Sequence, residues 1–340
     1  MSKNSTKVLF LLTLLSGVLI TISSNSWMGA WMGLEINLLS FIPIMSNSMN
    51  ILTSESSLKY FLIQSLASIT LLFLIFSKSF MEIMFNILNS PTSSNILLAP
   101  LLMKSGIPPF HWWFPGVMEG LSWMNCFILM SIQKIAPLTL INHFLSFNSL
   151  TIIIISLSIA IGAIGGLNQI SIRKIMTYSS INHIGWMMSS MILGNHLWFL
   201  YFFLYSFLTL TIIKIMNMYQ LSFINQINLT FNNNFILKFI FFSSMLSLGG
   251  LPPFLGFFPK WIIIQMLTFN NMFILVLFMV IFSLITLFYY LRMTYSSFMM
   301  LNSNINWIFL KNNKNYFIIS ILNMFSLIGL TLCSFTTNLY

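Results

Sequence analysis

Gly106-Ile107-Pro108-Pro109-Phe110 is the stretch that decides the fold, because it recurs later in the chain as Gly250-Leu251-Pro252-Pro253-Phe254. Each copy continues, at the same spacing, to a Phe-Pro pair, Phe114-Pro115 in the first and Phe258-Pro259 in the second. A proline removes a backbone donor and its ring clashes with the preceding turn, so each copy is predicted to break a helix. A lysine stands beside each break, Lys104 before the first and Lys260 after the second.

Both copies lie inside long apolar stretches. The chain of 340 residues is 58% hydrophobic and only 5% charged, whereas average soluble domains are about a quarter charged. A soluble protein is therefore excluded. A broken helix in a membrane frees polar backbone groups, which is tolerated only where they face protein or a water-filled cavity. Paired interruptions in the two halves of a chain point to the ion or substrate path of a transporter built from repeats.

Apolar runs follow one another almost without pause, and roughly 20 apolar residues are enough to cross a bilayer core. We expect about eleven membrane helices, at 8–23, 26–44, 57–77, 94–119, 122–144, 150–168, 174–193, 197–218, 236–268, 272–296 and 316–337. The spans at 94–119 and 236–268 carry the breaks, and the second is long enough for two half-helices. A secretory signal is the alternative for the first span, but no A-x-A-like cleavage site follows it.

Basic residues in the short loops predict the orientation, because they are enriched on the cytoplasmic or matrix side. One side of the expected topology holds only Lys78, whereas the side of the N-terminus holds Lys3, Lys7, Arg173, Lys174, Lys238, Arg292, Lys311 and Lys314. We therefore expect the N-terminus on the cytoplasmic or matrix side and the C-terminus on the opposite side. The net charge of +10 forms no basic stripe, so nucleic acid is not an expected partner.

Six charged side chains fall inside expected spans, where each costs at least about 2.5–3.5 kcal/mol on insertion scales. Two of them, Lys59 and Lys214, lie near span ends. Snorkelling to the interface is favoured for these two over an accessory role. The other four are central and are our candidate functional residues: Glu35, Lys104, Lys134 and Lys260. The alternative for these four is a purely structural ion pair.

The histidines carry weaker predictions. His111 follows the first break and is a candidate connecting group, whereas a structural hydrogen bond is favoured over a relay role for His183. His143 and His196 lie near span ends and are expected at the interface. No His, Cys or carboxylate cluster has metal-ligand spacing, no glycine-rich loop would cradle a nucleotide, and the chain contains no Asp. We therefore expect no metal, cofactor or redox centre in this chain.

Motifs in order along the whole chain carry a family resemblance: Trp31-Met32-Gly33-Leu34-Glu35-Ile36-Asn37, Glu55-Ser56-Ser57-Leu58-Lys59-Tyr60-Phe61, Lys104-Ser105-Gly106-Ile107-Pro108-Pro109-Phe110-His111, Ile132-Gln133-Lys134-Ile135-Ala136-Pro137, Tyr178-Ser179-Ser180-Ile181-Asn182-His183-Ile184-Gly185-Trp186 and residues 249–260. In these motifs the chain resembles the antiporter-like subunits of respiratory complex I (NADH:ubiquinone oxidoreductase), and among them the subunit 2 family of animal mitochondria. The antiporter-like subunits are related to Mrp-type cation/proton antiporters.

The resemblance implies a polytopic all-helical fold with two inverted five-helix repeats, 8–144 and 150–296, and a C-terminal helix at 316–337. It implies that three N-terminal helices of longer relatives are absent. Matched by motif, Glu35, Lys104, Lys134 and Lys260 are the family's intramembrane carriers, although some siblings have Glu at the position of Lys260.

The resemblance also implies a setting. The chain is expected in the mitochondrial inner membrane, with its N-terminus on the matrix side and its C-terminus on the intermembrane-space side. Expected partners are the lipid bilayer and other membrane-arm subunits of complex I, including sibling antiporter-like subunits. Flavin, iron–sulfur clusters and ubiquinone are expected in partner subunits, and a bound phospholipid is compatible with this chain.

The functional hypothesis is a proton relay through Glu35, Lys104, Lys134 and Lys260, driven by electron transfer in other subunits. Desolvation disfavours the charged form of a buried lysine, and a nearby carboxylate restores it. At about 4 Å and an effective dielectric near 20 such a pair is worth roughly 4 kcal/mol, so a change in the Glu35–Lys104 distance would load or unload a proton. Two alternatives stay open: a stand-alone or Mrp-type antiporter without electron-transfer partners, and a structural spacer between subunits.

The prolines are given a role in this hypothesis. Pro108-Pro109 and Pro252-Pro253 are expected to leave free carbonyls that hold water, and each opened helix offers a hinge. The alternative is a simple packing kink. Pro137, a turn after Lys134, is expected either to loosen the backbone near that lysine or to kink the helix for packing.

Overall fold

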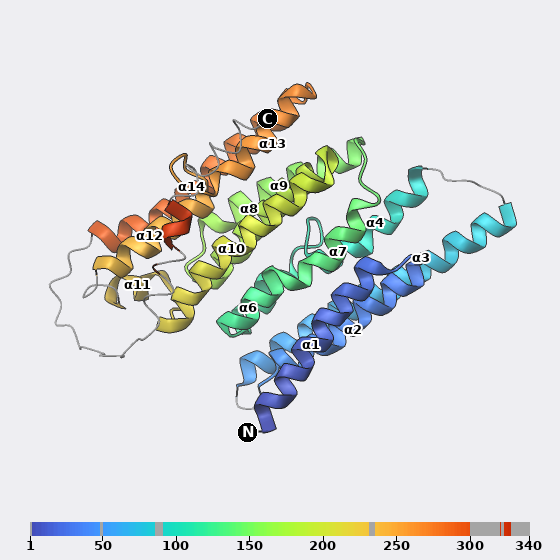
Figure 1. The fold of residues 1–340 in the computed structure, drawn as a ribbon, viewed down its shortest axis with the longest axis horizontal. Helices are drawn as coiled ribbons and strands as arrows, with labels where there is room; N and C mark the ends of the chain where they lie inside the picture. Colours follow the sequence, from blue (N-terminus) through green and yellow to red (C-terminus); the bar gives the residue numbers. More distant parts are fainter. Residues whose placement is uncertain are drawn as a thin grey trace. The chain divides into compact units, whose positions relative to one another are not determined.

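The computed structural model describes residues 2–47, 50–85, 91–230, 235–299, 320 and 323–327. Its named elements are all helices (Figure 1): α1 (Ser2–Ser23), α2 (Trp27–Met45), α3 (Ile51–Phe85), α4 (Pro91–Ser105), α5 (Trp113–Gly120), α6 (Trp123–Met130), α7 (Ile132–Asn142), α8 (Ser149–Leu167), α9 (Ile172–Leu193), α10 (Asn195–Tyr219), α11 (Ile224–Thr230), α12 (Phe235–Gly249), α13 (Phe257–Phe269) and α14 (Phe273–Met299). The short helix α11 lies in the connection between the expected spans at 197–218 and 236–268.

Seven helical stretches in the described part of the chain are long and apolar enough to cross a membrane: Ser5–Ser23, Trp27–Met45, Ile51–Phe80, Trp123–Asn142, Ser149–Leu167, Asn195–Tyr219 and Phe273–Tyr295. Shorter apolar helices supply three of the four halves of the broken spans, at Ile96–Ser105, Lys238–Gly249 and Phe257–Phe269. Large apolar side chains are exposed along these helices, for example Phe73, Phe203 and Ile274, as lipid contact requires. The predicted all-helical, multi-pass membrane architecture is therefore confirmed. The span expected at 316–337 lies outside the described residues except for 320 and 323–327.

The chain divides into two compact units, Met1–Ile154 and Ile155–Tyr340, and the division falls inside α8. In the first unit, the long helices α1 to α3 precede the broken pair α4 and α5 and the closing helices α6 and α7. In the second unit, α8 to α10 precede the broken pair α12 and α13 and the closing helix α14. Apart from the short helix α11 and the division of the closing span into α6 and α7, the order of elements is thus the same in both units. The inverted relation between them stays a prediction.

Both predicted breaks are confirmed, and glycine is the residue that ends each first half-helix. Gly106 follows α4 with a φ of 72°, and Gly250 follows α12 with a φ of 80°. This left-handed conformation is accessible to glycine because it has no Cβ. The amide after each glycine donates to a carbonyl five residues earlier, at 3.0 Å in the first copy and 3.4 Å in the second. This is the Schellman helix end, and the two prolines that follow prevent the helix from resuming.

The span expected at 122–144 is not one continuous helix. It consists of α6 and α7, which are separated at Ser131 with a φ of −114° and a ψ of −79°. Pro137 lies inside α7 and has no N–H, so the carbonyl of Gln133 lacks its helical donor. The helical hydrogen bonding is therefore interrupted on both sides of Lys134. Only the interruption at the proline was expected from the sequence.

Helix α9 differs from the other long helices of the described chain, because it is not among the stretches apolar enough to cross a membrane alone. Most of its side chains are buried inside the second unit. Its hydroxyl groups each donate to the carbonyl three residues earlier in the same helix: Thr177, Ser179, Ser180, Ser189 and Ser190. Its polar side chains are thus hidden in protein, which explains how a polar helix occupies an expected span.

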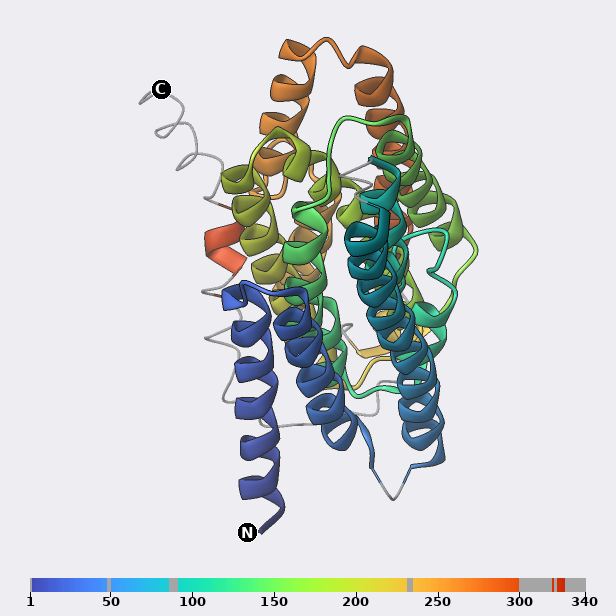
Figure 2. The ribbon, with the colours of Figure 1, turned by 90° about the vertical axis from the view of Figure 1, so that its right-hand side faces the viewer.

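Helices α1 and α2 lie side by side, as the two dark-blue helices of Figure 2 show. They pack through Gly17 and Gly33. A Cβ at Gly17 would lie 3.0 Å from the backbone nitrogen of Asn37, and one at Gly33 would lie 2.8 Å from that of Thr21. Small residues let membrane helices approach closely, and this contact fixes the helix that carries Glu35.

Gly33→Ala is expected to push α1 away from α2 and to reduce the amount of assembled protein. Overpacking of this kind costs about 1–3 kcal/mol. The thermal stability and abundance of the assembled protein measure the effect. Gly116→Ala on α5 is the control, because a Cβ there meets no atom within 4 Å. Equal stability of the two variants would contradict the close α1–α2 contact.

Candidate functional site

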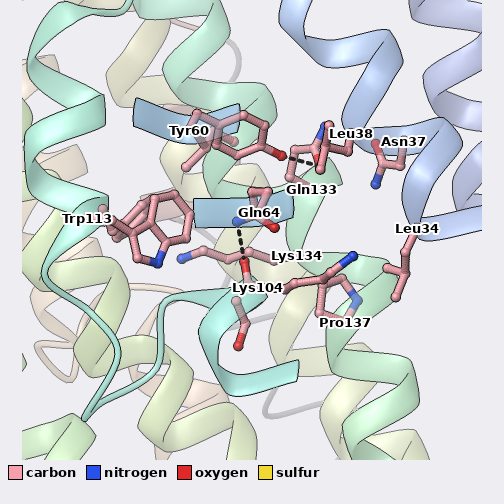
Figure 3. A pocket seen from close by; sticks show the side chains of 13 residues that line it. Leu34, Asn37, Leu38, Tyr60, Gln64, Lys104, Trp113, Gln133, Lys134 and Pro137 are labelled. Carbon is pink, nitrogen blue, oxygen red and sulfur yellow. Dashed lines mark hydrogen bonds between the residues drawn. The ribbon is translucent and has the colours of Figure 1, made fainter. Parts of the chain in front are cut away.

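A small cavity of about 20 Å³ lies beside the first break, within the first unit (Figure 3). A water molecule needs roughly 10–15 Å³, so this cavity is large enough for one. Six helices contribute to its lining: Leu34, Asn37, Leu38, Tyr60, Gln64, Lys104, Ser105, Trp113, Phe114, Leu129, Gln133, Lys134 and Pro137. The cavity therefore brings together two of the predicted lysines, Lys104 and Lys134.

Lys104 occupies the last turn of α4, where unpaired helix carbonyls carry partial negative charge and favour a cation. Its side chain is buried. Its own carbonyl is the one that Pro108 deprives of a helical donor. That carbonyl instead accepts a hydrogen bond from Nε2 of Gln64 at 3.1 Å, as Figure 3 shows. We expected this carbonyl to hold water, and the structure gives it a protein donor.

Glu35, the expected partner of Lys104, is half-buried on α2. A carboxylate near a buried lysine favours the charged form of that lysine. The two side chains form no ion pair within 4.0 Å. Their interaction is therefore electrostatic across a gap, and it is weaker than the contact pair considered from the sequence.

Lys134 is 3% exposed on α7. Its Nζ lies 4.6 Å from the centroid of the Phe114 ring, and a cation over an aromatic face gains about 0.5–2 kcal/mol. Phe114 belongs to the duplicated motif and sits at the start of α5. The first break thus places an aromatic face against the second lysine of the cavity.

Neutral polar side chains that the sequence analysis missed complete the cavity. Tyr60 donates its hydroxyl to Oε1 of Gln133 at 3.3 Å. Two buried atoms that face the cavity have no hydrogen-bond partner among the described residues, Oδ1 of Asn37 and Nε2 of Gln133. One is an acceptor and the other a donor, and a water molecule can pair with either kind of group. The available signal was the occurrence of amides inside apolar spans, one of them directly before Lys134.

Lys260 lies in the first turn of α13 and reaches back across the second break. Its Nζ donates to the carbonyl of Gly249 at 2.9 Å and to that of Leu248 at 3.5 Å. These are the two carbonyls that Pro252 and Pro253 deprive of helical donors. The sequence analysis expected these carbonyls to hold water, and in the structure they bind the lysine ammonium. The partial negative charge at the C-terminal end of α12 therefore stabilises the ammonium of Lys260, as a carboxylate would.

Lys260 has an aromatic neighbour on α9. Its Nζ lies 5.8 Å from the Trp186 ring. One turn earlier on α9, Nδ1 of His183 is 2.9 Å from the hydroxyl of Tyr201. A second small cavity of about 10 Å³ is lined by His183, Tyr201, Tyr205 and by Pro259 at the break. His183 thus has the buried hydrogen bond that we favoured, and a relay role for it stays a prediction.

The remaining predicted residues are more scattered. His111 is buried in the linker of the first break, beside Trp112, and its Nδ1 has no hydrogen-bond partner among the described residues. Lys59 is exposed on α3 and Lys214 is partly exposed on α10, so neither belongs to the lining of the two cavities. Within the ranges that the structure describes, no group of three or more His, Cys, Asp or Glu side chains is arranged to hold a metal ion.

A multi-pass helical membrane protein with two broken helices and a buried lysine at each break indicates the antiporter-like class of transport subunits. The sequence profile of the family described as NADH:quinone oxidoreductase/Mrp antiporter, TM, matches residues 24–286. The chain is 52% identical over 324 residues to NADH-ubiquinone oxidoreductase chain 2 of Anopheles gambiae, covering 95% of this chain and 94% of that one. It is 44% identical over 331 residues to the same subunit of Locusta migratoria, covering 97% and 96%. The chain belongs to the NADH-ubiquinone oxidoreductase chain 2 family.

Solved structures share the fold. A chain of respiratory complex I from Thermus thermophilus matches with a TM-score of 0.83 at 20% identity, over 96% of this chain and 78% of that chain. A chain of the Mrp complex from Dietzia sp. matches with a TM-score of 0.74 at 17% identity, over 84% and 59%. At these identities the likeness is one of fold.

Proposed function

We propose that this chain is a membrane subunit of NADH:ubiquinone oxidoreductase that translocates protons through Glu35, Lys104, Lys134 and Lys260. Membership in the chain 2 family supports the assignment to that enzyme. The observation that carries the relay is the placement of two buried lysines, Lys104 and Lys134, on one water-sized cavity. A purely structural subunit has no need of two desolvated cations there.

The first steps of the relay follow from the contacts in the first unit. In this relay Lys104 holds a proton while the carboxylate of Glu35 and the C-terminal end of α4 favour its ammonium form. When Glu35 is neutralised or moves away, Lys104 releases this proton to water held between Asn37 and Gln133. Lys134 accepts it, and its cation is stabilised over the Phe114 ring. Lys260 joins the relay as the buried lysine of the second unit, with the carbonyls of Leu248 and Gly249 favouring its charged form.

Membership in the family supports a setting for this function. The subunit lies in the mitochondrial inner membrane with its N-terminus on the matrix side. It assembles with the other membrane-arm subunits, including sibling antiporter-like subunits. Electron transfer takes place in partner subunits that hold flavin, iron–sulfur clusters and ubiquinone, and this chain contributes no redox group. Co-purification with flavin- and iron–sulfur-containing subunits tests this setting, since a stand-alone antiporter would purify without them.

Lys104→Met is expected to lower the number of protons translocated per NADH oxidised in the assembled complex. Glu35→Gln is expected to lower it less, because the carboxylate acts across a gap and contributes less than the roughly 4 kcal/mol of a contact pair. Acidification measured with a pH-sensitive dye in membrane vesicles, beside the rate of NADH oxidation, gives this ratio.

Lys59→Met is the matched control, because Lys59 is a span lysine whose side chain is exposed. It is expected to assemble and translocate protons like the unaltered chain. Normal proton translocation by a fully assembled Lys104→Met complex would contradict the relay and favour a structural role for the buried charges.

A further inference from the structure

Residues 323–327, near the end of the chain, form hydrogen bonds with both sides of the second break. The helical residues 323–327 belong to the span that we expected at 316–337. Nδ2 of Asn323 donates to the hydroxyl oxygen of Ser243 on α12 at 2.8 Å. The same hydroxyl lies 3.0 Å from Oδ1 of Asn323, to which it can donate. Asn323, Ser326 and Ser243 are all nearly inaccessible. A buried polar cluster of this kind fixes a geometry, because each unmade hydrogen bond is costly.

The same segment also binds the linker on the other side of the glycine. The backbone N–H of Leu255 donates to the carbonyl of Ser326 at 3.1 Å. The Ser326 hydroxyl donates to the carbonyl of Asn323 at 2.7 Å and lies 3.1 Å from its Oδ1. Residues 323–327 therefore hold α12 through Ser243, and hold the approach to α13 through Leu255.

This double attachment bears on Lys260. Lys260 contacts α12 only by reaching back from the first turn of α13 to the carbonyls of Leu248 and Gly249. Its ammonium keeps these contacts only while the start of α13 stays beside the end of α12. A Cβ at Gly256, at the start of α13, would meet the carbonyl of Ser247, so the two sides of the break already touch. The segment 323–327 bonds to both sides of this junction.

The first break has no equivalent of this attachment in the sequence. The position of Ser243 in the second copy corresponds to Ala99 in the first, which has no hydroxyl group. The side-chain donors described at the first break come from Gln64 of α3 and from Trp113, which donates to the carbonyl of Met103 at 3.1 Å. The two breaks thus share a glycine with a positive φ and are held by different parts of the chain.

We propose that residues 323–327 form a clamp that holds the second break closed, and that Asn323 is a positioning residue for proton exchange at Lys260. The proposal rests on the proposed function of Lys260 and adds to it a control by residues 323–327. If the clamp opens, α13 moves relative to α12 and Lys260 loses the carbonyls that favour its charged form.

The test uses the assembled complex with Asn323→Leu, which keeps the volume of the side chain and removes its amide. Hydrogen–deuterium exchange is measured by mass spectrometry on peptides that cover residues 250–256 and residues 106–112. We expect exchange in 250–256 to rise by about threefold or more, the equilibrium equivalent of about one hydrogen bond. Exchange in 106–112 should stay the same. The number of protons translocated per NADH oxidised should fall in the same variant.

Ser243→Ala is the second variant, because it deletes only the hydroxyl that faces Asn323. This smaller change keeps the test possible if Asn323→Leu does not assemble. Ser244→Ala is its matched control, since the Ser244 hydroxyl is equally buried and donates to the carbonyl of Phe241 in its own helix. Ser243→Ala should raise exchange in 250–256, and Ser244→Ala should not.

Unchanged exchange in 250–256 in both Ser243→Ala and Asn323→Leu would overturn the clamp. A rise in exchange with an unchanged proton ratio would overturn the positioning role. Neither outcome tests the relay in the first unit, which Lys104→Met tests separately. If Lys104→Met pumps normally while the clamp variants show the expected exchange, the proposed function fails and the clamp stands as a structural contact.

Discussion

With glutamate in place of Lys260 the complex is expected to assemble poorly, whereas with methionine it is expected to assemble and to pump weakly. The ammonium of Lys260 donates to the carbonyls of Leu248 and Gly249. A carboxylate cannot donate a hydrogen bond to these carbonyls, and its negative charge faces the negative end of α12. Lys260→Glu is therefore expected to cost at least about 3 kcal/mol of stability. Methionine loses charge-assisted hydrogen bonds worth about 1.5–3 kcal/mol, but it also removes a buried charge.

The abundance of assembled complex on native gels measures the first effect, and the ratio of protons translocated to NADH oxidised measures the second. Lys59→Glu is the control for charge reversal, because the Lys59 side chain is exposed and has room to reorient toward the interface. The resemblance to the wider family admits Glu at the position of Lys260 in sibling subunits. Equal assembly of the glutamate and methionine variants would therefore show that the freed carbonyls of this break do not bind Lys260.

A second large effect is expected at the glycines of the duplicated motif. Gly106→Ala and Gly250→Ala both place a Cβ on a residue with a positive φ, 72° and 80°, which costs roughly 1–2 kcal/mol. At Gly250 the new Cβ would also lie 3.0 Å from Nζ and from Cδ of Lys260. At Gly106 its nearest neighbours are ring and side-chain carbons of Trp113 and Phe114 at 3.4–3.6 Å.

The two variants are therefore expected to lose similar stability and to differ in function. Gly250→Ala should lower the proton ratio more than Gly106→Ala, because it displaces the ammonium of Lys260 from its carbonyls. Melting temperatures of the assembled complex and proton ratios are measured on both. A larger functional loss in Gly106→Ala would mean that strain at the break, rather than contact with Lys260, governs the effect.

The sequence was sufficient to predict the features whose causes are local. Two prolines after a glycine end a helix wherever they occur, so both breaks were placed correctly. A central charge in an apolar run has few explanations other than function or pairing, which led to Glu35, Lys104, Lys134 and Lys260. The structure then buries these three lysines as expected and leaves Glu35 half-buried.

The partners of these residues were beyond the sequence, because they depend on which helices lie side by side. Gln64 meets the carbonyl of Lys104 across 40 positions of the chain, and Asn323 meets Ser243 across 80. No spacing rule links positions so far apart. The separation of α6 from α7 at Ser131 was also missed, since serine is tolerated in helices and gives no breaking signal comparable to that of Pro137.

The polar character of α9 has a consequence for how the protein is made. A helix that carries Thr177, Asn182, His183 and several serines on buried faces gains little from contact with lipid, so it does not partition into the bilayer by itself. Neighbouring helices must therefore cover the polar side chains of α9. A Cβ at Gly162 of α8 would meet Asn182, and one at Gly185 of α9 would meet Ser158 of α8, so α8 and α9 are matched surfaces. We therefore expect α9 to enter the membrane together with its neighbouring helices rather than alone.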